Sequence, residues 1–421
     1  MSLAPKELLR ALFQTAVDAA AARHCVPPNL PAPPSGRTVV VGAGKAAAAT
    51  AKAVEDHWPA DRALGGLVIT RYDHGVACRA IEVIEAGHPV PDATGVAAAG
   101  RMLAAVQGLG ENDLVLALIS GGGSSLLALP APGLTLADKQ AVTRALLKSG
   151  APISEFNCVR KHLSGVKGGR LALAAAPGRV VSLIISDVPG DDPATVASGP
   201  TVADPTTRQD AMAILEKRAI AIPPAVRAWL ESSASETPKP GAAAFARVDN
   251  RIVATAQESL DSAVRTAEQH GFTAINLGDR IEGEAREEAC MHAELALRHA
   301  RSGVPCAIIS GGETTVTVKG KGRGGRNAEY LLALALALQG APEVWAIACD
   351  TDGIDGTETN AGAIIGPDTL ARAKALGMDA HAMLSNNDAY GFFEKLGDLV
   401  ETGPTRTNVN DFRAILVGAK S

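Results

Sequence analysis

The sequence is poor in aromatic residues, which make up 3% of its 421 positions. Hydrophobic residues nevertheless reach 47%, so Ala, Val, Leu and Ile must fill most of the core. Small aliphatic side chains of this kind suit helices that pack on parallel sheets. The length is sufficient for two or three domains of ordinary size. We therefore expect a large α/β protein.

Long apolar runs are also missing. A membrane-spanning helix needs about 18 consecutive apolar residues, and even Leu331–Leu338 is too short. The first residues lack a basic segment followed by an apolar core, and residues 6–22 predict an amphipathic helix instead. We expect a soluble, cytoplasmic protein with no membrane partner.

An excess of basic residues is absent as well, because the formal net charge is −5. The protein has no overall excess of Lys and Arg to neutralise the phosphates of a nucleic acid, which argues against nucleic acid as a partner. A small anionic ligand fits the local clusters of basic residues better. Homo-oligomerisation is left open by the composition.

The six cysteines form no C-x-x-C pair and show no zinc-like spacing with His. We expect them to be buried apolar residues in a reducing compartment.

Apolar runs alternate with helical segments along the chain, which predicts parallel strands covered on both faces. In the first half, the predicted strands are residues 38–41, 66–70, 81–84, 113–119 and 180–185. Residues 231–244 are small, polar and Pro-bearing, which is typical of a linker. A second series of predicted strands follows at residues 251–254, 274–277, 305–310, 313–318 and 344–349. This organisation predicts one domain over residues 1–231 and another over residues 245–421.

The segment Lys319–Asn327 holds four cationic side chains and four glycines and precedes a leucine-rich helical run. Glycines allow backbone N–H groups to converge on an anion, and the start of a helix adds a positive dipole end. Arg side chains offer planar forks to phosphate or carboxylate. The pattern indicates polyphosphate chemistry, although a solvated hairpin turn would show the same composition.

A second glycine turn, Gly42-Ala-Gly-Lys45, follows the predicted strand at residues 38–41. It approximates the dinucleotide fingerprint, but the next strand ends at Arg71 and not at the carboxylate that would hold a ribose. Arg71 would at best suit a 2′-phosphate. Lys45 has no role in nicotinamide binding and favours phosphate or carboxylate as the ligand.

A third turn, Ser120-Gly-Gly-Gly-Ser-Ser125, follows another apolar strand. Three glycines and several hydroxyls can form a backbone nest for an anion, and a plain strand-to-helix turn is the alternative. The sequence Ile309-Ser-Gly-Gly312 echoes it in the second half.

Asn157, Arg160 and Lys161 fall at helical spacing, so several of them can share a face. His162, beside them, could act as a base, but a surface histidine is the more ordinary interpretation.

Acidic residues follow two predicted strands. Asp187, Asp191 and Asp192 lie after the strand at residues 180–185, and Asp350, Asp352 and Asp355 lie after the strand at residues 344–349. Ligands of open α/β sheets bind beyond the carboxyl ends of strands, and Mg²⁺ usually takes one or two carboxylates plus phosphate oxygens. Metal binding, ribose contact and ordinary Asx-turn capping all remain open for these residues.

Taken together and in this order, the motifs resemble the glycerate 2-kinase family with a MOFRL domain, some of whose members are named hydroxypyruvate reductase. The matching segments are 42–45, 120–125, 157–170, 186–201, 310–327, 350–356, 387–390 and 402–411. The resemblance covers nearly the whole chain. It implies a Rossmann-like parallel α/β domain and a smaller mixed α/β domain, with the active site in the cleft between them.

The resemblance also implies an ATP- and Mg²⁺-dependent transferase that phosphorylates D-glycerate at its 2-hydroxyl. Lys45 and Arg326 match active-site positions of the family, and Asp187 is the candidate third catalytic residue. The candidate substrate-binding residues are Asn157, Arg160 and Lys161, and the candidate metal ligands are Asp187, Asp192 and Asp352. The candidate phosphate- or nucleotide-binding residues are Gly42, Gly44, Gly121, Gly122, Gly123, Ser124, Ser125, Gly311, Gly312, Glu313, Lys319, Arg323 and Asn327.

Two other functions remain open from the sequence. One is an NAD(P)H-dependent hydroxypyruvate reductase, which should consume NADPH without ATP. The other is a non-catalytic nucleotide- or anion-binding protein, which should bind nucleotide without turnover.

Overall fold

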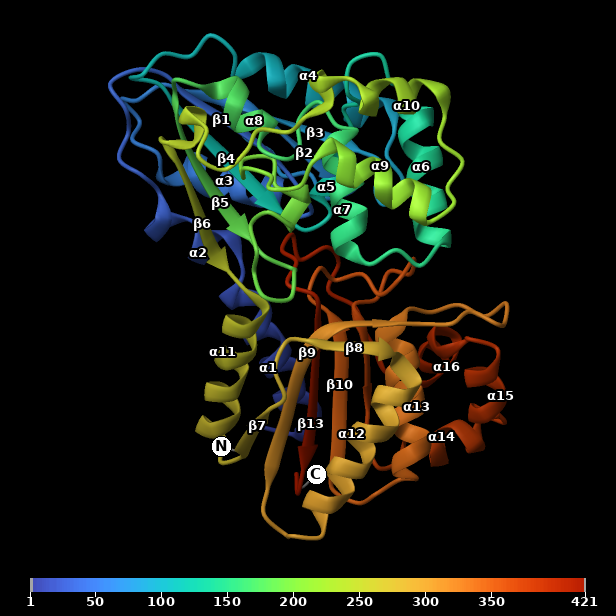
Figure 1. The fold of residues 1–421 in the computed structure, drawn as a ribbon. Coiled ribbons are helices and arrows are strands. Elements are labelled where there is room, and N and C mark those ends of the chain that lie inside the picture. Colours follow the sequence, from blue (N-terminus) through green and yellow to red (C-terminus); the bar gives the residue numbers. More distant parts are fainter. Residues whose placement is uncertain (1–2, 420–421) are drawn as a thin grey trace. The chain divides into compact units, whose positions relative to one another are not determined.

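The structure is a computed structural model that describes residues 3–419 (Figure 1). Its contacts divide the chain into two compact units. One unit comprises residues 22–253, and the other combines residues 3–21 with residues 254–419. The predicted domains instead ran over 1–231 and 245–421, and their outermost ends, residues 1–2 and 420–421, lie outside the described residues.

The unit of residues 22–253 contains a six-stranded parallel sheet with the strand order β3-β2-β1-β4-β5-β6. Its strands are β1 (Thr38–Ala43), β2 (Leu64–Arg71), β3 (Ile81–Ala86), β4 (Leu114–Ser120), β5 (Arg179–Ile185) and β6 (Val248–Ala254). Val41 and Ala117 face one apolar cluster, whereas their neighbours Val40 and Leu116 point to the opposite face and are equally buried. Burial on both faces explains why these strands are apolar runs and do not alternate.

Strand β6 differs from the sequence-based expectation. Residues 251–254 were expected to begin the second domain, but β6 completes the first sheet beside β5. The reason is that its partner lies far back in the sequence: Val180 donates its backbone N–H to the carbonyl of Arg247 at 3.0 Å. The predicted linker therefore precedes the last strand of this unit.

Helices of the same unit surround the sheet and form a bundle beside it. They are α2 (Ala22–Cys25), α3 (Ala47–His57), α4 (Ala93–Ala105), α5 (Gly123–Leu126), α6 (Leu136–Lys148), α7 (Ile153–His162), α8 (Arg170–Ala175), α9 (Arg208–Lys217) and α10 (Pro224–Glu231). Helices α6, α7, α9 and α10 lie together (Figure 1) around an apolar core that includes Val142, Phe156 and Leu215. Thr135 and Thr207 begin α6 and α9 with capping boxes, which fix where these helices start.

The other unit contains a mixed sheet with the order β12-β11-β10-β13-β9-β7, and β8 pairs with β9. Its strands are β7 (Thr273–Asn276), β8 (Ile281–Glu284), β9 (Cys306–Thr315), β10 (Val344–Asp350), β11 (Gly362–Ile365), β12 (Leu399–Val400) and β13 (Asp411–Val417). The central β10, β13 and β9 pair antiparallel, whereas β7 and β8 run parallel to β9.

Strand β9 is one strand where the sequence suggested two, at residues 305–310 and 313–318. Gly312 has a φ of +114°, and a Cβ there would lie 2.1 Å from the carbonyl oxygen of Ile281. The missing side chain lets β8 approach, so the strand passes through its two glycines without a break.

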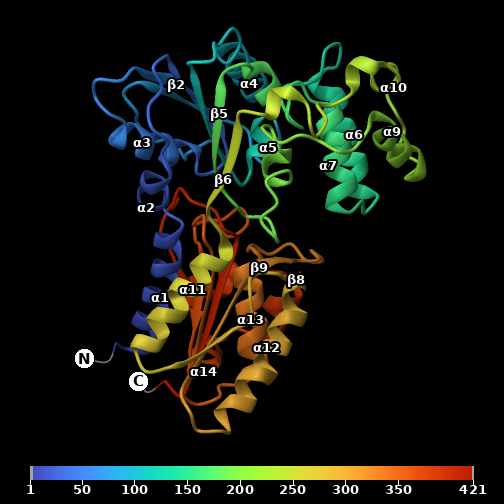
Figure 2. The same ribbon diagram turned by 60° about the vertical axis from the view of Figure 1, so that its left-hand side comes forward.

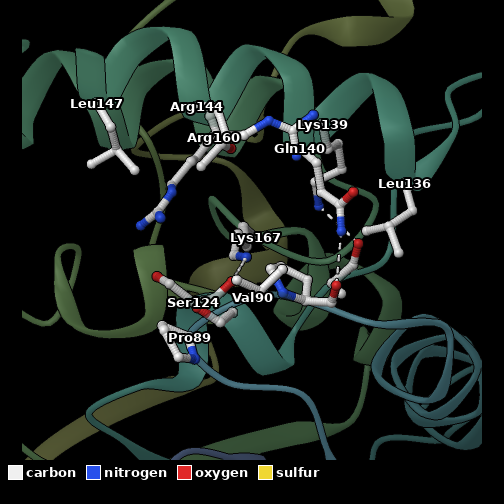
Figure 3. A pocket seen from close by; sticks show the side chains of 14 residues that line it. Pro89, Val90, Ser124, Leu136, Lys139, Gln140, Arg144, Leu147, Arg160 and Lys167 are labelled. Carbon is white, nitrogen blue, oxygen red and sulfur yellow. Dashed lines mark hydrogen bonds between the residues drawn. The ribbon is translucent and has the colours of Figure 1, made fainter. Parts of the chain in front are cut away.

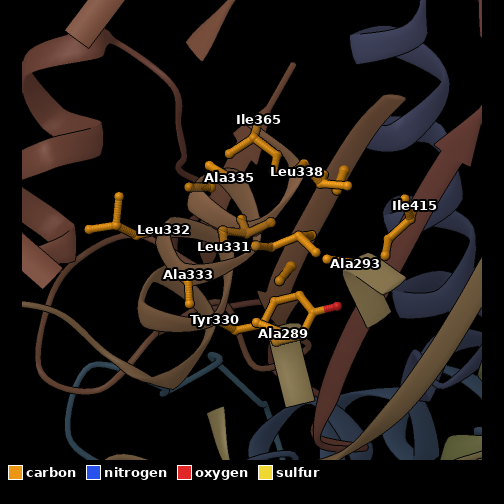
Figure 4. Close-up of a cluster of buried hydrophobic side chains, with 14 of the residues drawn as sticks. Ala289, Ala293, Tyr330, Leu331, Leu332, Ala333, Ala335, Leu338, Ile365 and Ile415 are labelled. Atoms are coloured by element: carbon orange, nitrogen blue, oxygen red, sulfur yellow. The ribbon is translucent and has the colours of Figure 1, made fainter. Parts of the chain in front are cut away.

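Helices cover both faces of this second sheet. They are α1 (Pro5–Ala19), α11 (Ala256–Gln269), α12 (Ala285–Ala300), α13 (Arg326–Leu338), α14 (Thr369–Ala375), α15 (Ala380–Ser385) and α16 (Ala389–Leu396). On one face Tyr330, Leu331 and Ile415 belong to a single buried cluster (Figure 4). On the other face α1 and α11 lie side by side (Figure 2), and Leu9 and Phe412 belong to the cluster beneath them.

The sequence predicted the amphipathic first helix, but it did not predict that this helix packs on the mixed sheet of the second unit. Leu8, Leu9, Leu12 and Phe13 are buried in the cluster that also contains strand residues of β9, β10 and β13. The apolar face of α1 thus covers a face of the mixed sheet, which explains why residues 3–21 belong to the unit of residues 254–419.

The helices and the cysteines bear on two further expectations. No helix within residues 3–419 is both long and apolar enough to span a membrane. The six cysteines are unpaired, and Cys25, Cys158, Cys306 and Cys349 are buried as expected. Cys290 on α12 is exposed and Cys78 is partly exposed, contrary to the expectation of burial.

Candidate functional site

The two glycine turns of the first unit form one structure at the carboxyl ends of β1 and β4. These strands are parallel neighbours, so the turns that follow them meet. Lys45 donates its backbone N–H to the carbonyl of Gly121 at 2.8 Å, and Ala46 donates to Oγ of Ser120 at 3.1 Å. A Cβ on Gly44 would lie 2.1 Å from Oγ of Ser120, so this close approach requires glycine.

Gly122 brings Lys45 close to His88, a residue that the sequence analysis did not select. Gly122 has a φ of +79°, and a Cβ there would lie 2.9 Å from Nε2 of His88 and 3.2 Å from Cγ of Lys45. Burial, together with the charge of Lys45, lowers the pKa of His88 to about 3. The imidazole is therefore neutral at physiological pH, and its Nδ1 has no hydrogen-bond partner within residues 3–419. Its only sequence signal was its place just after strand β3.

Ser124 connects the glycine turn to two other segments. Its Oγ lies 2.8 Å from Oγ of Ser198, which in turn donates to Oδ1 of Asn157 at 3.1 Å. Ala197 and Ser198 both have positive φ, at +52° and +60°. Such strained backbone in non-glycine residues is held only where surrounding contacts fix it, and it is concentrated at functional sites. Asn157, predicted to bind substrate, is buried and orients this loop.

A cavity of about 310 Å³ adjoins Ser124 and Ser125 (Figure 3). Helices α6 and α7 supply Lys139, Arg144 and Arg160 to its wall, and Lys167 lies at its base. No Asp or Glu is among the residues that line it. The volume is within the range of small-molecule sites, and the lining favours an anion.

Within the described residues, the cations of this cavity form no ion pair with a carboxylate. Lys139 donates to the carbonyls of Ala128 and Leu129 at 2.9 and 3.2 Å, and burial together with Arg160 lowers its pKa to about 7. Lys167 donates to the carbonyls of Ser124 and Leu127, and burial lowers its pKa well below the usual range.

The guanidinium of Arg160 lies 4.0 Å above the ring of Phe156, and burial lowers its pKa to about 10. Burial thus destabilises the charged forms of these side chains, and a bound anion would stabilise them.

The neighbours of Arg160 on α7 have other partners. Lys161 is buried and pairs with Asp204 at 3.4 Å, so its ammonium does not line the cavity. His162 is not the surface histidine that its charged neighbours suggested. Its ring is completely buried, with Nδ1 2.8 Å from the carbonyl of Cys158 and Nε2 3.4 Å from Glu236.

The candidate metal ligands are divided between the two units. Asp187 is half-buried just beyond β5, and Asp192 is exposed and accepts hydrogen bonds from the N–H of Ala194 and the hydroxyl of Thr195. Asp352 is buried in the other unit and accepts from the N–H of Ile354 at 2.8 Å. Within residues 3–419 no three His, Cys, Asp or Glu side chains form a group that could hold a metal ion.

In the second unit, Arg326 begins helix α13 and bridges three carboxylates. Its Nε, Nη1 and Nη2 lie 2.8 Å from Asp411, 3.0 Å from Glu313 and 3.0 Å from Asp350. Burial opposes its charge, but these carboxylates outweigh that effect and raise its pKa well above the usual value. The charge of Arg326 is therefore already neutralised. The pair with Glu313, whose side chain is 56% exposed, is the weakest and the easiest to exchange for a ligand.

Asp355 fixes the start of the same helix. Its two carboxylate oxygens accept from the N–H groups of Asn327 and Ala328 at 3.0 and 2.8 Å. Burial raises its pKa to about 7, although these two hydrogen bonds act in the opposite direction. Asn327 also donates its side-chain amide to Asp411 at 2.8 Å. Asp355 and Asn327 thus position Arg326 by fixing its helix.

The rest of the basic glycine segment is held by residues 386–390. Asn387 accepts from the N–H groups of Lys319 and Gly320 at 2.8 and 2.9 Å. Arg323 pairs with Glu358 and lies 4.4 Å above the ring of Tyr390. Gly311 and Gly312 lie inside β9 and not in a turn. The segment has a defined conformation, but its Arg side chains already have protein partners.

Two family models match the chain. The model described as "Domain of unknown function (DUF4147)" matches residues 8–231, and the MOFRL family model matches residues 306–411.

Known proteins are similar over nearly the whole chain. A protein of Agrobacterium vitis named "Putative hydroxypyruvate reductase" is 54% identical over 98% of this chain and 94% of its own length. The D-glycerate 2-kinase of Thermotoga maritima is 41% identical over 96% of this chain and 97% of its own length. The crystal structure of a glycerate kinase from Thermotoga maritima superposes with a TM-score of 0.88 at 40% identity, covering 98% of this chain and 99% of that one.

Proposed function

Because the chain belongs to the glycerate 2-kinase family with a MOFRL domain, we propose that it transfers a phosphoryl group from ATP to the 2-hydroxyl of D-glycerate. The relatives named glycerate kinase support the kinase class. The choice of the 2-hydroxyl and of ATP as donor is our proposal.

One observation carries the proposal: a cavity with four cationic side chains and no carboxylate adjoins the glycine turn of Ser120–Ser125. Phosphoryl transfer depends mainly on positioning and on neutralising phosphate charge. A cavity lined by cations and by no Asp or Glu would supply that neutralisation.

In this proposal Lys45 holds charge on the transferred group, since the turn that carries it is anchored to Gly121. His88 stays neutral beside Lys45, because its pKa is lowered to about 3. Its imidazole therefore adds no repulsion to Lys45. Arg326 releases Glu313 and offers one N–H edge to the substrate, while Asp411 and Asp350 keep the guanidinium in place.

Mg²⁺ belongs to the proposal through Asp187, which follows β5 at the carboxyl edge of the first sheet. A bound Mg²⁺ would neutralise phosphate oxygens, and it commonly takes only one or two protein carboxylates. Asp192 lies in the same loop as Asp187 and Asp191, and it retains lone pairs beyond its two hydrogen bonds.

The test is product formation. Purified protein is incubated with D-glycerate and Mg-ATP, and phosphorus NMR resolves 2-phosphoglycerate from 3-phosphoglycerate. We expect the 2-isomer, with L-glycerate as the stereochemical control. Formation of only the 3-isomer would overturn the assigned position, and nucleotide binding without product would indicate a non-catalytic binding protein.

A hydroxypyruvate reductase is the second candidate, and the sheet order favours it. The order β3-β2-β1-β4-β5-β6 is that of dinucleotide-binding sheets. Against it, β2 contains no Asp or Glu and ends at Arg71, so the ribose-binding carboxylate of the fingerprint is missing. NADPH oxidation with hydroxypyruvate in the absence of ATP, faster than any glycerate phosphorylation, would favour the reductase.

A further inference from the structure

The cavity beside Ser124 has two chemically different parts. One part carries Arg144, Arg160, Lys139 and Lys167. The other is apolar, and its rim includes Val90 and Leu147, each 65% exposed. Large aliphatic side chains this exposed, gathered around one cavity, are typical of a binding site.

The cationic part has room for an anion with several charges. No carboxylate partner is recorded within residues 3–419 for Arg144 or Arg160, and burial rather than a neighbouring charge determines the pKa of Arg160. Arg forks match phosphate oxygens in pairs. A single carboxylate would leave most of this positive charge without a partner.

The apolar part excludes the simplest anions. Inorganic phosphate or a three-carbon hydroxy acid is much smaller than a cavity of about 310 Å³ and has no surface for Val90 or Leu147 to cover. Leu147 projects from α6, and Pro89 and Val90 lie on the opposite side of the cavity (Figure 3). A flat apolar group between them would remove all three from water.

We propose that this cavity is the nucleoside triphosphate site, with the phosphates at Arg144, Arg160 and the Ser124–Ser125 turn and the base between Leu147 and Val90. The inference rests on the proposed kinase function and assigns its nucleotide to the unit of residues 22–253. Arg160, which the sequence placed with the glycerate-binding residues, becomes a nucleotide residue. The triphosphate then ends beside the turn that also orients Lys45.

The experiment measures binding of Mg-ATP and of magnesium tripolyphosphate to the full chain by calorimetry, without glycerate. Arg160→Gln and Arg144→Gln should each weaken both ligands about tenfold or more, as expected for a lost hydrogen bond to a charged group. Leu147→Ser should weaken Mg-ATP and leave tripolyphosphate unchanged. Lys148→Gln, on the same helix but outside the cavity, is the matched control and should change neither.

Several outcomes would overturn the assignment. Wild-type affinity for Mg-ATP in both Arg variants would remove the cavity from nucleotide binding. If tripolyphosphate binds the wild type as tightly as Mg-ATP does, the base does not contribute to binding in the cavity. If the Arg144→Gln and Arg160→Gln variants raise the KM for D-glycerate and leave the affinity for ATP unchanged, the cavity binds glycerate and not the nucleotide. Thermal melts, with Arg160→Lys as a second variant, separate lost binding from lost folding.

The two proposals can fail separately. Mg-ATP binding that is insensitive to the Arg variants, with 2-phosphoglycerate still formed, contradicts only the cavity assignment. Mg-ATP binding in the cavity without phosphorylation of D-glycerate contradicts only the kinase.

Discussion

Lys45 donates its backbone N–H to the carbonyl of Gly121 at 2.8 Å, and this hydrogen bond joins two glycine turns that are far apart in the sequence. The turns meet because β1 and β4 are adjacent parallel strands. This backbone contact holds the turn that carries Lys45, and a substitution of the Lys45 side chain leaves it in place.

Lys45→Met tests the charge alone. The backbone hydrogen bond to Gly121 should persist, so the protein should stay folded while kcat falls about 10²- to 10³-fold, as when one preorganised electrostatic group is lost. Lys52→Met, on helix α3 and paired with exposed Asp56, should keep wild-type kinetics. Steady-state rates of glycerate phosphorylation, with circular dichroism to confirm folding, decide the matter. A folded Lys45→Met enzyme with near-normal kcat/KM would contradict the proposed role.

Gly122→Ala should disturb the turn. Its new Cβ would lie 2.9 Å from Nε2 of His88, at a φ of +79°. Gly133 has a nearly equal φ of +80°, and a Cβ there would have no atom within 4 Å. Gly133→Ala therefore carries only the strain of the left-handed conformation, about 1–2 kcal/mol. We expect Gly122→Ala to lose about 10- to 100-fold in kcat/KM through misplacement of Lys45. Gly133→Ala should lose stability but little activity. Equal kinetics in the two variants would show that crowding at His88 does not matter.

Arg326 should be more important for stability than its exposed neighbour Arg323. Arg326→Ala removes one of the two guanidinium groups that pair with Asp411, and it also removes the one that pairs with Asp350; these carboxylate side chains are 0% and 7% exposed. Removing one partner of such buried charges costs about 3 kcal/mol, whereas the exposed pair of Arg323 with Glu358 should contribute less than about 1 kcal/mol. Urea unfolding of Arg326→Ala and Arg323→Ala measures the difference.

The role of Arg326 in activity is tested with the milder Arg326→Lys variant, which keeps the positive charge but cannot contact three carboxylates at once. We expect it to fold and to lose most of its kcat/KM for glycerate. Full activity in Arg326→Lys would leave Arg326 with a structural role only.

Asp355 predicts a distinctive pH dependence of stability. Burial raises its pKa in the folded protein to about 7, whereas its unfolded value is about 4. Between these values the folded state holds a proton that the unfolded state has lost, so this residue makes the protein less stable as pH rises from about 4 to 7. Asp355→Asn lacks this titration.

The free energy of unfolding of Asp355→Asn should therefore increase relative to that of wild type between pH 5 and pH 8. Denaturant titrations at several pH values measure the difference. A pH-independent difference would show that Asp355 does not titrate in this range.

Asp187→Asn should raise the Mg²⁺ concentration for half-maximal activity by about tenfold, as expected for the loss of one charged ligand contact. The KM for D-glycerate should change much less. Magnesium titrations of initial rates at saturating glycerate provide the comparison. A wild-type Mg²⁺ profile in the variant would reject Asp187 as a ligand, and a selective change in the glycerate KM would place it at the substrate instead.

Local patterns in the sequence were sufficient for much of the fold. Continuous apolar runs predicted β1, β2, β4 and β5, because strands covered on both faces have no polar side. Helix α6 begins at a capping box formed by Thr135 and Asp138, which is visible in the sequence itself. The turns that hold Lys45 and Ser124 were also recognisable, because each has glycines directly after a predicted strand. The pair Gly311–Gly312 has the same local pattern but lies inside β9.

Tertiary structure decided what no local pattern contains. Helix α1 and strand β6 each belong to the unit that the chain order did not suggest. The apolar face of α1 packs on a sheet formed far away in the sequence, and the backbone of β6 pairs with β5. Arg160 and Lys161 are adjacent and similar in sequence. A helix turns by about 100° per residue, so Arg160 lines a cavity while Lys161 points to buried Asp204. The altered pKa values of His88 and Asp355 arise mainly from burial, with a contribution from neighbouring charges, and both depend on the packing of the whole unit.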